Sequence, residues 1–133
     1  MLQAKDIMTK DVVTVRTDTL VEEALELMLA HNISGLPVVS KDMTLMGIIT
    51  EKDILNQFFG RQKVEGKSVE EFMTQPAVHF DENDSLESIC KCLAEVTFRR
   101  VPVTKEGKVV GIVSRPDVLR CVKSTRVPTG RLW

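Results

Sequence analysis

The chain contains an internal repeat that covers most of its length. Met8-Thr9 recurs 65 residues later as Met73-Thr74, and Gly47-Ile48-Ile49-Thr50 recurs 64 residues later as Gly111-Ile112-Val113-Ser114. One residue is therefore missing between these segments in the second copy. A repeat of this length predicts two copies of one supersecondary unit that stack on each other, so any functional site is expected in two related versions.

The composition is that of an ordinary globular protein and argues against several classes of function. Of the 133 residues, 43% are hydrophobic and 28% are charged, and the net charge is −1. This balance gives no basic footprint for nucleic acid or for an anionic membrane. No apolar run approaches the roughly 20 residues that span a bilayer. The N-terminal residues 1–6 lack the apolar core of a signal peptide, so we expect a cytoplasmic protein.

The cysteines and histidines favour neither a disulfide framework nor a metal site. The chain has three cysteines, an odd number, and its two histidines are His31 and His79. Cys90 and Cys92 are two apart in a helical pattern, where side chains do not face each other. We therefore expect no bound metal, and we interpret these cysteines as small core residues.

Each copy is predicted to contain a short helix, a short strand, a helix, two strands joined by a hairpin, and a final helix. The β-branched and aromatic segments 12–15 and 77–80 are predicted to be the first strands. Thr19 and Asp84 are each followed three residues later by Glu, which predicts a capping box at the start of an amphipathic helix. The predicted organisation is a first repeat at 4–59, a linker at 60–67, a second repeat at 68–122 and a C-terminal tail at 123–133.

Prolines mark the strands that follow these helices. Pro37 and Pro102 each lie inside a compact apolar segment. Because proline cannot donate a hydrogen bond to a strand ladder, we expect these strands at a sheet edge or paired on one side only.

The chemistry of the chain is expected where the last strand of each copy leads into a helix. Thr50 and Asp53 in the first copy match Ser114 and Asp117 in the second, as a hydroxyl, two residues and an aspartate. One interpretation is structural: the hydroxyl caps the helix and the acid completes the cap. The other is functional: the helix N-terminus attracts phosphate and the aspartate accepts ribose hydroxyls. The two interpretations are compatible, and no catalytic set of side chains accompanies them, so we do not predict an enzyme.

The repeated motifs resemble a known family. Asp6-Ile7-Met8-Thr9, Gly35-Leu36-Pro37-Val38-Val39 and the segment from Gly47 to Ile54 resemble the CBS domain, named after cystathionine β-synthase, and two in tandem resemble a Bateman module. The likeness covers about residues 4–122. It implies a mixed α/β (α+β) fold of two β-α-β-β-α repeats, packed sheet to sheet with pseudo-twofold symmetry.

The resemblance also implies a ligand and the residues that bind it. Two clefts between the repeats would bind AMP, ADP, ATP or S-adenosylmethionine as a regulatory ligand, with no catalytic cofactor. The aspartates Asp53 and Asp117 would hold the ribose, and Thr50 and Ser114 would contact phosphate. The adenine pockets would be formed around Thr9, Val13, Ile33 and Gly35, or around Thr74, Val78 and Phe98.

The two copies differ in charge near these sites. Arg99 matches best an arginine that often reaches a nucleotide phosphate in the family, and Arg115 stands beside the helix start. A guanidinium is a natural bidentate phosphate partner. The alternative is that both are solvated surface arginines. We expect the second copy to contribute most to phosphate binding and the first cleft to be weaker or empty.

The predicted function is a stand-alone regulatory module that signals to a separate, unidentified protein, because the enzyme, channel or transporter domains of the family are absent from this chain. By family analogy it would form a disc-shaped homodimer through apolar helix faces, with no membrane partner. The alternative is a homodimeric interaction scaffold with empty clefts and no ligand. A nucleic-acid binder is disfavoured by the charge balance.

Overall fold

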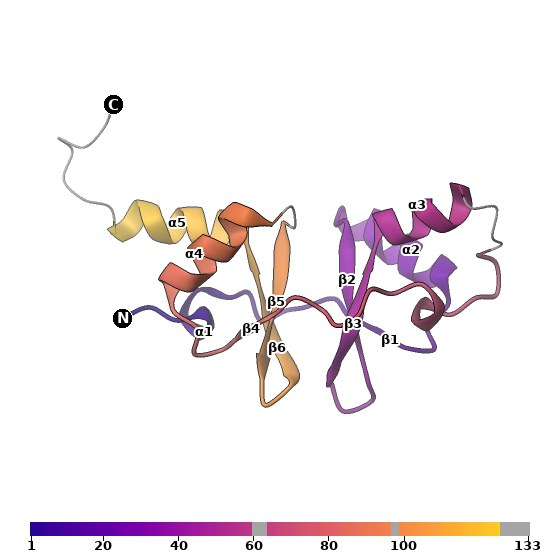
Figure 1. The fold of residues 1–133 in the computed structure, drawn as a ribbon, viewed down its shortest axis with the longest axis horizontal. Helices are drawn as coiled ribbons and strands as arrows, with labels where there is room; N and C mark the ends of the chain where they lie inside the picture. Colours follow the sequence, from indigo (N-terminus) through magenta and orange to yellow (C-terminus); the bar gives the residue numbers. More distant parts are fainter. Residues whose placement is uncertain (60–63, 97–98, 126–133) are drawn as a thin grey trace. The chain divides into compact units, whose positions relative to one another are not determined.

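The computed structural model describes residues 1–59, 64–96 and 99–125. Part of the predicted linker (60–63), the predicted pocket residue Phe98 and most of the predicted tail (126–133) lie outside these ranges. Strand, helix, strand, strand and helix follow one another in both copies, which confirms the predicted mixed α/β class (Figure 1). The elements are α1 (Ala4–Ile7), β1 (Val15–Arg16), α2 (Val21–His31), β2 (Gly35–Val39), β3 (Leu45–Thr50), α3 (Glu51–Phe59), the 3₁₀ turn η1 (Val69–Glu71), β4 (Phe80–Asp81), α4 (Leu86–Glu95), β5 (Arg100–Lys105), β6 (Lys108–Ser114) and α5 (Arg115–Thr125).

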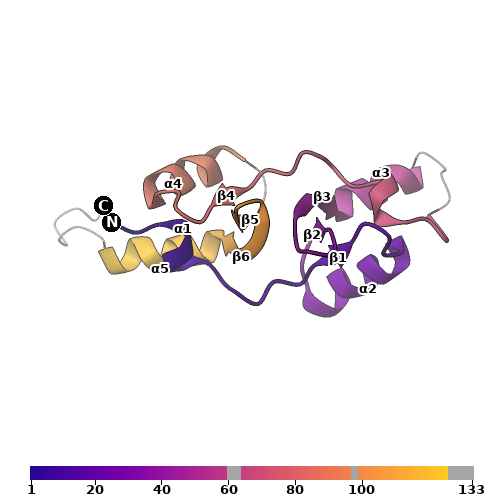
Figure 2. The same ribbon diagram turned by 90° about the horizontal axis from the view of Figure 1, so that it is seen from below.

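The chain forms two compact units whose boundaries differ from those of the sequence repeats. The first-copy unit comprises Val12–Val78 and Glu106–Val109, and the second-copy unit comprises Met1–Asp11, His79–Lys105 and the chain from Val110 onward. The N-terminal segment therefore folds with the second copy. Figure 2 shows the result, with α1 lying beside α5 although they come from opposite ends of the chain.

The hydrophobic cores explain this exchange of segments. Ala4, on α1, is fully buried in the core of the second-copy unit, and Val69, its equivalent in the repeat, is fully buried in the core of the first-copy unit. Each copy thus begins with a segment (residues 4–9 or 69–74, called the entry segment below) whose buried residue completes the core of the other copy. The first core also contains Val15, Val21, Ala24, Met28, Leu36, Val38, Ile49 and Ile54, and the second contains Phe80, Ile89, Leu93, Val101, Val103, Val113 and Val118.

Each unit contains a three-stranded sheet, in the order β1-β2-β3 or β4-β5-β6. The strands with Pro37 and Pro102 are central, so the prediction that they lie at an edge or pair on one side only was wrong for each strand as a whole. The prolines are tolerated because β1 and β4 are short: β1 pairs with Val38 and Val39 only, and β4 with Val103 and Thr104 only. Both ladders start one residue after the proline, where its missing N–H is not needed.

The first strands are shorter than predicted. The predicted strands at 12–15 and 77–80 overlap the observed ones only at Val15 and Phe80. Upstream of β1, Thr9 instead exchanges backbone hydrogen bonds with Ile112 on β6, at 2.8 and 2.9 Å. This part of the chain therefore joins the first copy's sheet only from Val15 onward, where it pairs with β2.

The predicted capping boxes at Thr19 and Asp84 were misplaced. The Thr19 hydroxyl accepts a hydrogen bond from the Arg16 amide, and the Asp84 carboxylate accepts one from the Asp81 amide, both at 2.9 Å. Each side chain closes the turn before its helix. The N-cap is the next residue along: Leu20 for α2, and Ser85 for α4, whose hydroxyl accepts from the Ser88 amide at 3.1 Å.

Close packing of the entry segments explains the glycine in each last strand. A Cβ built on Gly47 would lie 2.8 Å from the Thr74 carbonyl oxygen and 2.9 Å from the Met73 sulfur. A Cβ on Gly111 would overlap the Met8 sulfur and lie 2.7 Å from the Met8 Cγ. Only glycine lets the Met-Thr segment approach the strand this closely. Within the described ranges, no helix is both long and apolar enough to cross a bilayer.

Candidate functional site

The first carboxylate site, formed by Thr50, Asp53 and Thr74, lies where β3 leads into α3. Asp53 Oδ2 accepts hydrogen bonds from the Thr50 amide at 2.9 Å and from the Thr50 hydroxyl at 3.0 Å. The Asp53 amide donates to the same hydroxyl at 3.2 Å. Asp53 Oδ1 accepts from the Thr74 hydroxyl at 3.0 Å. The carboxylate is thus held by its own helix start and by the entry segment of the second sequence repeat.

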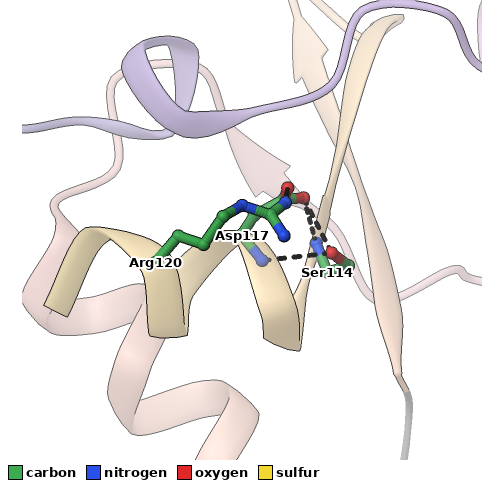
Figure 3. A network of polar contacts seen from close by, with 3 residues as sticks. All are labelled: Ser114, Asp117 and Arg120. Carbon is green, nitrogen blue, oxygen red and sulfur yellow. Dashed lines mark hydrogen bonds and ion pairs between the residues drawn. The ribbon is translucent and has the colours of Figure 1, made fainter. Parts of the chain in front are cut away.

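The second carboxylate site, formed by Ser114, Asp117 and Arg120, lies where β6 leads into α5 (Figure 3). Asp117 Oδ2 accepts from the Ser114 amide at 2.9 Å and from the Ser114 hydroxyl at 2.8 Å. The Asp117 amide donates to the Ser114 hydroxyl at 3.3 Å. Asp117 Oδ1 accepts from the Arg120 guanidinium at 2.6 Å. The local geometry of the first site is therefore repeated, with a different partner on the second oxygen.

The structural interpretation of the hydroxyl-aspartate pairs is confirmed in both copies. Each hydroxyl accepts the amide of the third helical residue, while the carboxylate accepts the amide of the hydroxyl residue, which is a complete capping box. Each hydroxyl also donates its proton to the carboxylate. A phosphate would therefore have to compete with the aspartate for that hydrogen bond, and a ribose hydroxyl would have to compete with the donor on the second carboxylate oxygen.

Sequence reasoning missed the partner of the second carboxylate oxygen in each site. Thr74 was assigned to the second copy's adenine pocket, but the structure brings it to Asp53 of the first copy. Arg120 was not singled out, although it stands three residues after Asp117. A comparison of the two copies would have identified Arg120, because the first copy has the uncharged Asn56 at the equivalent position.

The structure places the predicted phosphate-binding arginines at the start of α5. The Arg115 amide donates to the Arg99 carbonyl at 3.1 Å, so the backbone of Arg99 lies against the helix N-terminus, and its side chain is exposed. The Arg115 guanidinium donates to the Val96 carbonyl at 2.7 Å and to the Leu93 carbonyl at 3.4 Å. Arg115 thus stabilises the C-terminus of α4, and Arg99 is the better placed of the two for a phosphate.

The predicted adenine-pocket residues fall in different places. Gly35 lies directly opposite Thr50 in the β2–β3 ladder, so it is part of the surroundings of the first carboxylate site. Val13 and Ile33 pack against the first core, and the Val78 side chain is 40% exposed. Thr9 was grouped with these residues, but its backbone pairs with Ile112, two residues before Ser114. The threonines are therefore exchanged between the copies, as are the segments that carry them.

The described residues contain no group of three or more His, Cys, Asp or Glu side chains that could hold a metal ion. Cys90, Cys92 and Cys121 are half-buried, and burial raises the pKa of the Cys90 thiol.

The repeated architecture has a counterpart among known families. The family model of the CBS domain matches residues 4–60 and again residues 69–124. The chain belongs to the CBS-domain family. Both carboxylate sites lie inside the matched ranges, at equivalent positions of the two CBS domains.

Similar proteins support this assignment at the level of sequence and structure. MJ1225 of Methanocaldococcus jannaschii is 27% identical over 120 residues, which cover 90% of this chain but 42% of that protein. The CBS-domain chain thus spans less than half of this relative. The structure of CBSX2 of Arabidopsis thaliana in complex with AMP superposes with a TM-score of 0.84 at 31% identity, covering 96% of this chain and all of that one. The CBS-domain pair of MJ0100 in complex with 5′-methylthioadenosine and S-adenosylmethionine gives a TM-score of 0.78 at 28% identity, covering 95% of this chain and 99% of that one.

Proposed function

We propose that this CBS-domain pair is a regulatory module that binds an adenosine-type ligand (AMP, ADP, ATP or S-adenosylmethionine) at its two carboxylate sites. The observation that carries the proposal is the doubled constellation of a helix start, a hydroxyl residue and a fixed aspartate. A carboxylate accepts the two hydroxyls of a ribose, and a helix N-terminus favours a phosphate. The proposed role of both sites is binding and not catalysis.

The solved relatives support the class of ligand. CBSX2 was solved with AMP, and the MJ0100 pair with 5′-methylthioadenosine and S-adenosylmethionine. All three ligands contain adenine and a ribose with vicinal hydroxyls. They differ in the group at the 5′ position, which is a phosphate only in AMP.

The regulatory part of the proposal is that a separate cytoplasmic protein responds to the ligand-bound state. A ligand shifts an equilibrium only if it binds two states with different affinity. The Thr74–Asp53 hydrogen bond gives a physical route for such a difference, because Thr74 belongs to the segment that completes the first core. A ribose hydroxyl that replaces Thr74 on Asp53 loosens this attachment.

We further propose that the module is a homodimer. Leu55 and Phe58 on α3 are 51% and 70% exposed, and Leu119 and Val122 occupy the equivalent positions on α5 and are 66% and 43% exposed. In each helix the two residues are three apart, so they share a face. Exposed apolar groups at the same two positions in both copies are typical of an interaction surface.

A thermal-shift panel distinguishes the ligand-binding module from an interaction scaffold with empty clefts. The panel contains AMP, ADP, ATP, S-adenosylmethionine and NAD. A ligand that binds only the folded state stabilises it by about 2.7 kcal/mol at 100 times its dissociation constant, so at least one adenosine compound should raise the unfolding temperature. Unchanged unfolding temperatures across the panel at millimolar ligand would favour the scaffold.

A further inference from the structure

We propose that Arg120 makes the second carboxylate site selective for a phosphorylated ligand, whereas the first site also accepts an uncharged nucleoside. This inference rests on the proposed function and names the ligand preference of each site. In place of one site that is weaker for every ligand, it predicts two sites that differ in the chemistry they require.

Both carboxylate oxygens of Asp117 already accept hydrogen bonds. Its side chain is 8% exposed, Oδ2 is engaged by Ser114, and Oδ1 is engaged by Arg120 at 2.6 Å. The Arg120 bond is short and charge-assisted, which makes it stronger than a neutral hydrogen bond. The side chain of Arg120 is 71% exposed, so it can move away from the carboxylate when another anion takes the place of Asp117 as its partner.

Asp53 differs from Asp117 in the donor to its second carboxylate oxygen. Its Oδ1 is engaged by the neutral Thr74 hydroxyl at 3.0 Å. A ribose hydroxyl that displaces Thr74 exchanges one neutral hydroxyl donor for another. Asn56, at the position of Arg120, has no charge to lose. A nucleoside without phosphate therefore meets little electrostatic opposition at the first site.

Displacing the donor from the aspartate costs more at the second site than at the first. A ribose hydroxyl that displaces Arg120 exchanges a charged donor for a neutral one and leaves the guanidinium without its anion. A phosphate group restores an anion in the same region, since the N-terminus of α5 favours negative charge. The carbonyl of Arg99 accepts from the Arg115 amide at 3.1 Å, so the backbone of a second cationic residue lies beside that helix start. A nucleotide thus offsets a penalty that a nucleoside cannot.

Adenosine and AMP are the two probes for this inference, measured by isothermal titration calorimetry. The variant Asp53→Asn silences the first site, so that the titration reports the second site alone. In this background Arg120→Asn, which installs the first copy's residue, should strengthen adenosine binding by about three- to tenfold. AMP affinity should change by less than about twofold, because the loss of a competitor is balanced by the loss of a cation.

The reciprocal variant and a charge control complete the design. In the Asp117→Asn background, Asn56→Arg should weaken adenosine binding at the first site by a similar factor. Lys123→Asn removes a positive charge from the same helix, in its last turn, and should leave both affinities unchanged. Circular dichroism confirms that each variant is folded.

The outcomes separate the inference from the proposed function. If AMP binds but adenosine affinity responds neither to Arg120→Asn nor to Asn56→Arg, the selectivity is not set by this residue and the inference fails while the proposed function stands. If AMP binds to none of the proteins, the wild type included, both fail. An equal gain from Lys123→Asn would show a general charge effect and would also overturn the inference.

Discussion

Hydrogen bonds in the turn between β2 and β3 control the ionisation of Asp42. Its Oδ1 accepts hydrogen bonds from the Ser40 hydroxyl, from the Thr44 hydroxyl at 2.8 Å and from the Thr44 amide at 3.3 Å. These bonds, the one from Ser40 above all, lower the pKa of Asp42 from 3.8 to about 2. Since the folded pKa is depressed, the ionised carboxylate stabilises the turn above pH 3.8, and this contribution is lost as the pH falls toward 2.

We therefore predict that Ser40→Ala raises the pKa of Asp42 toward its ordinary value, because the strongest donor to the carboxylate is removed. The measurement is an NMR titration of the carboxyl carbon. Ser40→Thr, which keeps a hydroxyl at this position, is the control and should retain the low midpoint. The same midpoint in wild type and Ser40→Ala would show that the turn does not hold the carboxylate.

At the same scale, the sequence predicted the residues of the sites better than their partners. The hydroxyl-aspartate pairs could be predicted because Thr50 and Asp53 are three apart and form one helix cap. The Thr74–Asp53 contact joins residues 21 apart, so no local rule reveals it. Arg120 was within reach of a local rule, but only a comparison with Asn56 shows that it makes the two sites different.

At the scale of elements, the packing of the entry segment that contains Met8 against strand β6 depends on Gly111. We predict that Gly111→Ala lowers the free energy of unfolding by about 1–3 kcal/mol, because its Cβ overlaps the Met8 side chain. The Met8 sulfur and Cγ are the closest atoms, so Gly111→Ala should cost much less when Met8→Ala is already present. Urea unfolding of the two single variants and the double variant gives this coupling.

Gly47 provides the matched contrast. There the closest atom is the backbone oxygen of Thr74, at 2.8 Å, which no side-chain change removes. Gly47→Ala should therefore stay destabilising in a Met73→Ala background. Additive costs at Gly111 and Met8, or relief of Gly47→Ala by Met73→Ala, would contradict this account of why glycine is needed.

The boundaries of elements were the part of the fold that local rules placed least well. Thr19 and Asp84 were predicted as caps, but each closes the preceding turn, because the strand before it ends at Arg16 or Asp81 and needs that hydrogen bond. Pro37 suggested an edge strand, yet the neighbouring strand β1 is too short to reach it. In both cases the outcome depends on where a second element ends, which one segment of sequence does not specify.

At the scale of the whole molecule, the repeat predicted two units but not their composition. The sequence copies are contiguous, whereas the compact units exchange their entry segments, with Ala4 in the second core and Val69 in the first. Either residue could fill a core of its own copy on composition alone. The choice depends on chain connectivity and packing over more than 60 residues, which the order of motifs does not reveal.

The proposed homodimer is tested at this scale by charging the exposed faces of α3 and α5. We predict that Leu55→Glu and Leu119→Glu together convert a dimer to a monomer, because burying a carboxylate in an apolar interface is unfavourable. Light scattering coupled to size-exclusion chromatography gives the mass. The exposed Glu23→Gln on α2 is a surface control. A monomeric wild type, or a dimer that survives both charges, would contradict the assignment of this surface.

The central claim is that the two aspartates bind an adenosine-type ligand. Asparagine is the informative substitution, because its carbonyl can still accept the Thr50 or Ser114 amide while its NH₂ group cannot accept a ribose hydroxyl. The direct measurement is calorimetric titration of AMP into wild type, Asp53→Asn, Asp117→Asn and the double variant. The account predicts binding to wild type, loss of one site in each single variant and loss of all binding in the double variant. AMP that binds the folded double variant as tightly as wild type would contradict it.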